Sequence, residues 1–252
     1  MKGIKKLLSV FVLLFGTCGN IVARENGVQF NVQGDIVSSY VWRGMYQSGA
    51  AFQPTLGLCA GNFSFTAWGS VDFTGQGHKE ADITASYSIA GLTVSLADLW
   101  WAGQSGIKND HENGRNYYFD FDKNSTDHIV EAGFSYVLPV ERFPLSVSWY
   151  TMLWGGDKKL TAKGELKQAY STYLEAAYPF TVKGVDLVAA IGCSPWKSQT
   201  NYYNDRFAVT NVYLKATKVL GITDKFSIPI FVQTIWNPDR EDVHFVLGIT
   251  FR

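Results

Sequence analysis

The feature that most constrains the fold of this chain is an alternation of apolar and polar residues over Val28–Met45. Apolar side chains hold the even positions and end with Tyr40 and Trp42, whereas the odd positions include Asp35 and Arg43. A period of two is typical of a β-strand with one apolar and one polar face. At about fifteen residues, this strand is long against the usual five or six. A transmembrane barrel needs this pattern in every strand. Lipid offers the backbone no hydrogen-bond partners, so a sheet that spans a membrane cannot have an open edge.

The same alternation recurs in eleven further runs along the chain. The runs cover residues 52–60, 62–73, 80–89, 92–96, 129–138, 145–153, 170–180, 185–193, 208–217, 226–236 and 243–251. An even number of amphipathic strands is typical of bacterial outer-membrane barrels. We therefore expect an all-β chain that forms a closed antiparallel transmembrane β-barrel of about twelve strands.

The connections between these runs also alternate in length. Those that begin at residues 60, 90, 139, 181 and 220 are short, whereas the longest begin at residues 102, 155 and 195. Short periplasmic turns that alternate with longer external loops are the outer-membrane topology. A secreted β-sandwich or lectin is the soluble alternative, but it gives no reason for this parity.

The end of the fifth run is ambiguous. Strict alternation through Ala97–Trp101 directs Asp98 into lipid. A charge there costs about 2–4 kcal/mol at the middle of the membrane and less near its surface. A β-bulge would turn Asp98 inward instead, so the sequence leaves both placements open.

The start of the chain, residues 1–23, is expected to be a secretory signal peptide. Three lysines precede the apolar run Leu7–Phe15, which is too short to cross a bilayer as a helix, and Ile21–Ala23 suits cleavage. Cys18 raises a lipoprotein as the alternative, but Thr17 is a poor residue before a lipidated cysteine. The mature chain, residues 24–252, is then the barrel.

The charge of the mature chain argues against nucleic acid as a partner. The full sequence has 22 basic and 22 acidic residues, so loss of the three signal-peptide lysines leaves a net charge of −3. Such a chain has no electrostatic attraction for nucleic acid. The two cysteines of the mature chain, Cys59 and Cys193, fall on opposite strand faces, so no disulfide between them is expected.

The segment Ser39–Gly44, with the sequence SYVWRG, resembles the first-strand motif of the TorF-type family of porins. Further stretches fit Bacteroidota-like members of that family, at residues 53–54, 67–70, 170–173 and 237–238. The resemblance spans most of the mature chain. It implies the fold and location of an outer-membrane barrel, and it implies no particular substrate.

The strand registers predict which charged side chains face the interior of the barrel. The acids are Asp35, Asp72, Glu80, Asp82, Glu131, Glu175 and Asp186, and the bases are Arg43 and Lys215, beside a neutral His244. An excess of carboxylates in a narrow channel favours cations. The alternative is a packed polar core in which the two bases pair with acids. Arg43 is our first choice for a constriction residue or an internal salt bridge, with Glu131 or Glu175 as its partner.

Aromatic residues at the strand ends predict contact with outer-membrane lipid. Trp and Tyr concentrate at the two membrane surfaces of such barrels. Sugar stacking is an alternative role that this girdle explains more simply. The residues expected at the interfaces are Tyr40, Trp42, Trp149, Tyr178 and Trp236.

Two further motifs are weak. Asp120–Asn124 with Glu131 has the one, three, five and twelve spacing of a calcium loop, but Ser125 stands where the glycine is required. An outer-membrane phospholipase can use a Ser–His pair, but none of the four histidines lies near a nucleophile or metal-binding motif. We therefore expect no metal, no cofactor and no catalysis.

These patterns together predict a multi-pass barrel in the outer membrane of a Gram-negative cell, inserted by the barrel assembly machinery. Its expected function is passive diffusion of small polar solutes, with cations favoured. The alternative is a non-conducting structural or surface-interaction barrel that acts through the external loops at residues 102–127 and 155–167.

Overall fold

The computed structural model describes residues 27–75, 77–103, 116–140, 143–223 and 226–252. The predicted signal peptide lies outside the described residues, and so do residues 104–115 of the predicted external loop 102–127.

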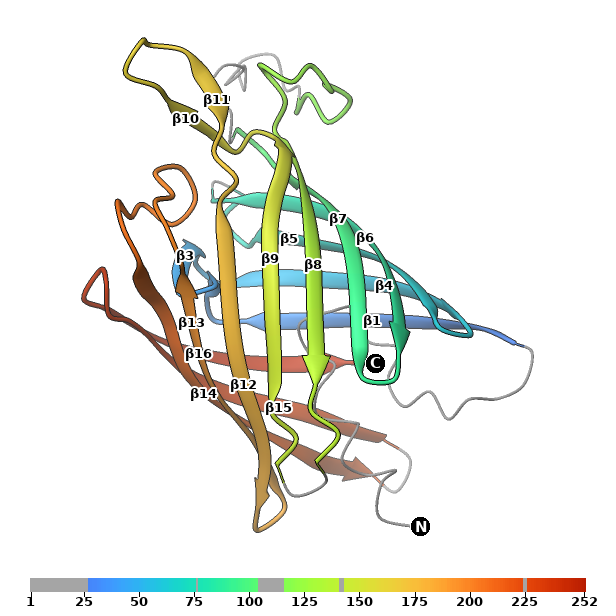
Figure 1. Ribbon diagram of the computed structural model, residues 1–252. Helices are drawn as coiled ribbons and strands as arrows, with labels where there is room; N and C mark the ends of the chain where they lie inside the picture. The colour runs from blue at the N-terminus through green and yellow to red at the C-terminus, as the bar shows by residue number, and fades with distance from the viewer. Residues whose placement is uncertain (1–26, 76, 104–115, 141–142, 224–225) are drawn as a thin grey trace.

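The described chain folds into a closed barrel in which twelve strands form the wall, and every pairing in the wall is antiparallel (Figure 1). This confirms the predicted fold class and strand number. Each predicted run after the first overlaps one wall strand. The first run, Val28–Met45, overlaps one wall strand and extends beyond it. The wall strands are β1 Val28–Val37, β4 Ala51–Ala60, β5 Phe63–Asp72, β6 Lys79–Ile89, β7 Leu92–Trp101, β8 His128–Val137, β9 Ser146–Gly155, β12 Thr172–Val182, β13 Val185–Ser194, β14 Ala208–Thr223, β15 Phe226–Asn237 and β16 Asp242–Phe251.

The outer surface of the wall is apolar, because the alternation turns one set of side chains away from the axis. Phe30, Leu56 and Phe245 are 79%, 58% and 65% exposed, whereas their chain neighbours face inward. Cys59 is buried on the inner side and Cys193 is a free thiol, so the two cysteines are not joined, as expected. Within the described ranges no helix is long and apolar enough to cross a membrane.

The wall closes between β1 and β16 over a short overlap. The register pairs four residues of each strand, from Gly34 with Phe251 to Val37 with Gly248. On its other side, β1 pairs with β4 along its whole length, from Val28 to Val37. The seam is therefore the shortest pairing in the wall.

The connections differ at the two ends of the barrel, as predicted. Tight turns join β4 to β5, β6 to β7 and β12 to β13 at one end. The opposite end carries the longer connections, including the small hairpin of β10 (Lys158–Leu160) and β11 (Leu166–Gln168), which projects beyond the wall (Figure 1).

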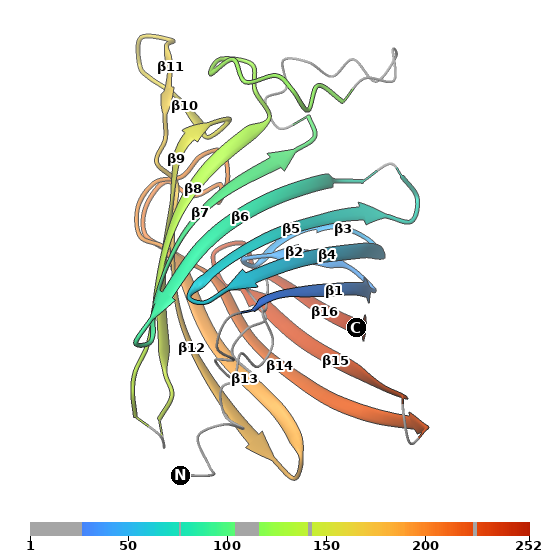
Figure 2. The same cartoon turned by 90° about the vertical axis from the view of Figure 1, so that its right-hand side faces the viewer.

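The prediction of one long first strand is wrong beyond Val37. The chain leaves the wall there and forms β2 (Tyr40–Trp42) and β3 (Met45–Ser48), a hairpin that pairs only with itself and lies within the curve of the wall (Figure 2). We call residues 40–48 the inner hairpin. Its turn is Arg43–Gly44, with φ of 49° and 82°. Positive φ at both central residues defines the type I′ turn that suits a two-residue hairpin.

The inner hairpin is pressed against the opposite wall at its tip. A Cβ on Gly44 would lie 1.8 Å from the carbonyl oxygen of Thr210 in β14, so only glycine permits this approach. The side-chain amide of Asn237 donates to the carbonyl of Gly44 over 3.1 Å. The hairpin thus crosses the interior from the β1 side to β14 and β15.

The structure also settles the placement of Asp98, which faces outward without a bulge in the register of β7. The Nδ1 atom of His128 lies 2.9 Å from the Asp98 carboxylate, and His128 Nε2 lies 2.5 Å from the carbonyl oxygen of Tyr118. The ring of Phe121 stacks on His128 at 4.4 Å. The charge is tolerated on the outer face because it lies near the loop end of β7 and the segment 116–127 covers its partner.

We expect Gly44→Ala to displace the inner hairpin, because its methyl group would overlap the β14 backbone. Trp42 should become accessible to a small fluorescence quencher, and the thermal midpoint should fall. Gly61→Ala is the matched control: Gly61 also has positive φ, of 59°, but nothing beyond its chain neighbours lies within 4 Å of the place its methyl group would take. A fall of equal size in both variants would show that φ strain of about 1–2 kcal/mol, and not the close approach, causes the effect.

Candidate functional site

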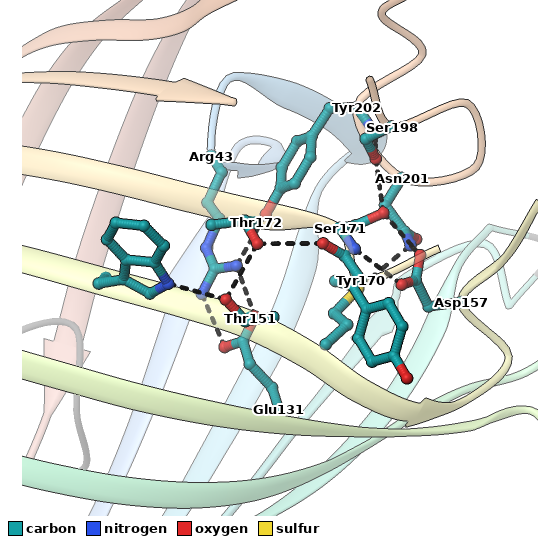
Figure 3. Close-up of polar contacts among 12 residues, drawn as sticks. Arg43, Glu131, Thr151, Asp157, Tyr170, Ser171, Thr172, Ser198, Asn201 and Tyr202 are labelled. Carbon is teal, nitrogen blue, oxygen red and sulfur yellow. Dashed lines mark hydrogen bonds and ion pairs between the residues drawn. The ribbon is translucent and has the colours of Figure 1, made fainter. Parts of the chain in front are cut away.

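The guanidinium group of Arg43 lies at the centre of a polar and aromatic cluster inside the barrel (Figure 3). Its Nη1 and Nη2 atoms donate to the two carboxylate oxygens of Glu131 over 2.7 and 2.8 Å. Nη1 also donates to the hydroxyl of Tyr202 over 2.8 Å. The side chains of Arg43 and Glu131 are only 13% and 7% exposed. The predicted internal salt bridge is therefore present, and Glu131 is the partner.

Three aromatic rings surround the same guanidinium group. Its central carbon lies 4.4 Å from the ring centroids of Trp42 and Tyr150 and 4.8 Å from that of Tyr173. A cation over the face of an aromatic ring is attracted by about 0.5–2 kcal/mol, with the larger values for desolvated pairs. The positive charge of Arg43 is thus met by a carboxylate, a hydroxyl and these rings.

Different elements supply these groups. Glu131 comes from β8, Tyr150 from β9 and Tyr173 from β12, whereas Tyr202 comes from the loop at residues 195–207. Inward-facing glycines make room for the rings. A Cβ on Gly192 would lie 2.0 Å from the Tyr173 hydroxyl oxygen, and one on Gly133 would lie 2.9 Å from the Tyr150 ring.

The rings also contact one another across the interior. Trp42 stacks on Tyr202 at 5.7 Å and meets Trp101 edge-on at 5.0 Å. Tyr173 stacks on Tyr202 at 5.9 Å and on Tyr150 at 6.5 Å. Trp42 of the inner hairpin therefore packs between side chains of the wall and of loop 195–207.

Tyr40, at the start of β2, anchors the inner hairpin to the wall a second time. The hydroxyl of Tyr40 donates to Glu80 over 2.9 Å, and the indole nitrogen of Trp101 donates to the other carboxylate oxygen of Glu80 over 2.5 Å. His78 Nε2 lies 3.0 Å from Glu80. Tyr40 is only 8% exposed.

The prediction that Tyr40 and Trp42 lie at the membrane interface is therefore wrong. Both sit on the inner hairpin because the wall strand ends before them. Trp149, Tyr178 and Trp236 do lie on the outer face: Trp149 and Trp236 are each 43% exposed, and Tyr178 contacts Phe143 and Phe180 there.

Loop 195–207 is held in place by a polar network around Asp157 (Figure 3). Ser171 donates from its hydroxyl and its backbone nitrogen to the two carboxylate oxygens of Asp157 over 2.6 and 2.9 Å. The side-chain amide of Asn201 donates to Asp157 over 2.6 Å, and the Ser198 hydroxyl lies 2.6 Å from that of Ser171. The network ties the loop after β9 to the loop that carries Tyr202.

Burial shifts the pKa of two groups at the loop end of the site. It raises the pKa of the Asp157 carboxyl, and the hydrogen bonds from Ser171 and Asn201 act in the opposite direction. Burial also raises the pKa of the Tyr202 hydroxyl, which therefore stays protonated beside Arg43. Tyr202 is itself fixed, since its backbone nitrogen donates to the Ser198 hydroxyl over 3.3 Å.

The remaining predicted lumen residues are spread along the interior. Glu175 lies near Arg43, and it accepts from the hydroxyl of Tyr173 over 2.7 Å. Asp35 accepts from Gln33, and Asp186 accepts from Thr181 at the turn end of the barrel. The Lys215 ammonium lies 3.9 Å from the centroid of Phe231. The structure therefore unites Arg43, Glu131 and Glu175, and it does not bring Asp35, Asp186 or Lys215 to the same place.

Part of the interior is apolar, which the sequence patterns did not lead us to expect. Val37, Tyr213, Phe231, Ile235 and Val246 form one buried cluster, against which Val41 of the inner hairpin packs. The signal for it was present, because these positions are apolar on the face that the register assigns to the interior. The side chains and the hairpin together fill this part of the barrel.

The calcium motif is not assembled. Glu131, its twelfth position, belongs to β8 and pairs with Arg43 inside the barrel, whereas Asp120 accepts from Ser125 within the loop. Across the described ranges, no three His, Cys, Asp or Glu side chains are grouped so that they could hold a metal ion.

Comparison with known proteins found only weak structural similarities. No family model matches the sequence, and no curated protein matches it. OmpF of Salmonella typhi, in a complex with daunomycin, is 10% identical with a TM-score of 0.37, and the match covers 89% of this chain and 98% of that one. CdiB from Acinetobacter baumannii is 9% identical with a TM-score of 0.41, covering 89% of this chain and 59% of that one. Both similarities are too low to bear on function.

We expect Glu131→Gln to destabilise the barrel by about 3–5 kcal/mol, because removal of one partner leaves the buried charge of Arg43 uncompensated. The free energy of unfolding, from urea titration in lipid vesicles, measures this. Glu165→Gln is the matched control, since Glu165 pairs with Lys167 at the surface with side chains 58% and 62% exposed. Such a pair contributes about 0–1 kcal/mol. Equal losses in the two variants would contradict the assigned role of Glu131.

Proposed function

We propose that the protein is a porin-type channel of the Gram-negative outer membrane, closed in this structure by the inner hairpin. The apolar outer surface and the two classes of connections support the membrane location, and insertion by the barrel assembly machinery belongs to the same proposal. Membership of the TorF-type porin family is proposed on the resemblance of residues 39–44, which include the Arg43–Gly44 turn of the hairpin. The proposed function involves no catalysis.

One observation carries the proposal: the inner hairpin is not part of the wall. Its backbone ladder joins only β2 and β3, and none of the described wall strands pairs with it. Side-chain contacts at Arg43 and Tyr40, with the hydrogen bond from Asn237, hold it across the interior. It can therefore move without breaking the closed hydrogen-bonded wall, which a membrane requires.

The charges around the closed site support small polar cations as the preferred solutes. Carboxylates that face the interior near the hairpin include Glu80, Asp82, Glu131 and Glu175. The guanidinium group of Arg43 offsets one of them. If the hairpin moves away, the positive charge of Arg43 leaves the interior while the carboxylates stay, and fixed carboxylates lining a pore favour cations.

A second candidate function is a non-conducting barrel that binds a surface partner through its loops. The buried apolar cluster around Phe231 and Ile235 favours it, because that cluster occupies part of the interior independently of Arg43. Exposed apolar side chains on the loops supply a surface for such a partner, among them Leu160, Leu166, Tyr203 and Phe207.

Planar-bilayer recording tests the channel. Replacement of residues 40–48 by a Gly/Ser linker of equal length should raise the unit conductance severalfold and shift the reversal potential in a KCl gradient toward cation selectivity. The matched control replaces residues 160–166, the tip of the projecting β10–β11 hairpin, and should conduct as the wild type does. Arg43→Ala should increase the open time. Silence of the wild type and of the 40–48 replacement would contradict the channel and favour the second candidate.

A further inference from the structure

The wall side of the Arg43 site is complete without the inner hairpin. Arg43 and Trp42 belong to the hairpin, whereas Glu131, Tyr150 and Tyr173 belong to wall strands and Tyr202 belongs to loop 195–207. We call these last four residues the cation cage. Figure 3 shows Arg43 entering between Glu131 and Tyr202 from the hairpin.

We propose that Arg43 is a tethered occupant of a cation-binding site, and that the cage takes the guanidinium group of a solute when the hairpin leaves. This inference rests on the proposed function for access, because a solute reaches the cage only if the hairpin moves. It adds the chemical class of the solute.

The charge of Glu131 favours a cation in the cage. With the hairpin in place, the Glu131 side chain is 7% exposed and its counter-ion is Arg43. When Arg43 departs, the carboxylate loses that counter-ion, and the loss of one partner of a buried ion pair is costly. Opening of the hairpin therefore creates a demand for a cation at this position, and a solute that supplies it favours the open state.

The shape of the pairing selects guanidinium over ammonium. Both carboxylate oxygens of Glu131 accept from separate nitrogens of one planar group, over 2.7 and 2.8 Å. This two-pronged pairing fits a guanidinium and not the compact ammonium of lysine or a simple amine. The rings of Tyr150 and Tyr173 lie 4.4 and 4.8 Å from the central carbon, as is favourable for a flat cation.

The cage is also held rigid by contacts that do not involve the hairpin. Asn211 donates to the Tyr173 hydroxyl over 2.8 Å, and that hydroxyl donates to Glu175 over 2.7 Å. The Asp157 network holds the loop that carries Tyr202. The cage should therefore keep its geometry after Arg43 is removed, and preorganised sites bind with less loss of entropy.

The test is chemical rescue of Arg43→Ala, purified in detergent, by methylguanidinium at millimolar concentration. At about five times its Kd, methylguanidinium should raise the thermal midpoint of the variant by roughly 2–4 °C. Wild-type protein, whose cage is filled, should not shift. Methylammonium chloride carries the charge without the planar shape, and methylurea has the planar shape without the charge. Neither control should raise the thermal midpoint.

The double variant Arg43→Ala/Glu131→Gln should lose the rescue. If Arg43→Ala does not fold alone, its refolding yield with methylguanidinium is compared with its yield in sodium chloride of equal ionic strength. The absence of a selective shift and of a selective gain in yield would overturn the inference, as would equal rescue by methylammonium. Binding is measured here without conduction, so a protein that binds methylguanidinium but carries no current would refute the channel alone.

Discussion

The structure depends on closure of the backbone hydrogen-bond ring. Each wall strand has a partner strand on both sides, so the wall has no free edge strand while its apolar side chains face outward. Twelve strands enclose more space than the side chains of an eight-stranded wall would fill, and less than an open sixteen-stranded porin encloses. The interior of this barrel is completed by connections that fold into it, namely the inner hairpin and loop 195–207.

These two inward segments meet at one guanidinium group. Arg43 reaches Glu131 on the wall and Tyr202 on the loop, and its own turn contacts β14 through Gly44. A buried ion pair of this kind adds little to stability compared with apolar packing, but the loss of either partner is costly. Its effect is to hold the hairpin in one position across the interior.

The wall could be predicted from the sequence because its period of two gives each strand one apolar outer face and one face toward the interior. The partner of Arg43 could also be narrowed to Glu131 or Glu175, since both lie on inward positions of their strands. The hairpin was missed because Tyr40 and Trp42 keep the even register of the preceding strand. The sequence signal for the end of the strand is that apolar residues, Val37, Val41 and Met45, take odd positions that carry polar residues earlier in the run. In the structure, Arg43–Gly44 has the two positive φ values of a tight turn. The ring contacts could not be predicted, because they join elements far apart in the sequence.

The four-residue seam has a mechanical consequence for the whole cylinder. Residues Val28–Gln33 pair with β4 but have no partner in the register of β16, so more than half of β1 is paired on one side only. Stress applied to the wall concentrates where the fewest hydrogen bonds between strands resist it. The barrel should therefore open between β1 and β16 before it opens between any other pair of wall strands. Between the paired residues of β1 and the inner hairpin, Ser38 still bonds Leu247 through its backbone nitrogen and its hydroxyl. These two bonds fix the chain between the hairpin and the seam, so a shift of the hairpin need not load the weakest joint of the barrel.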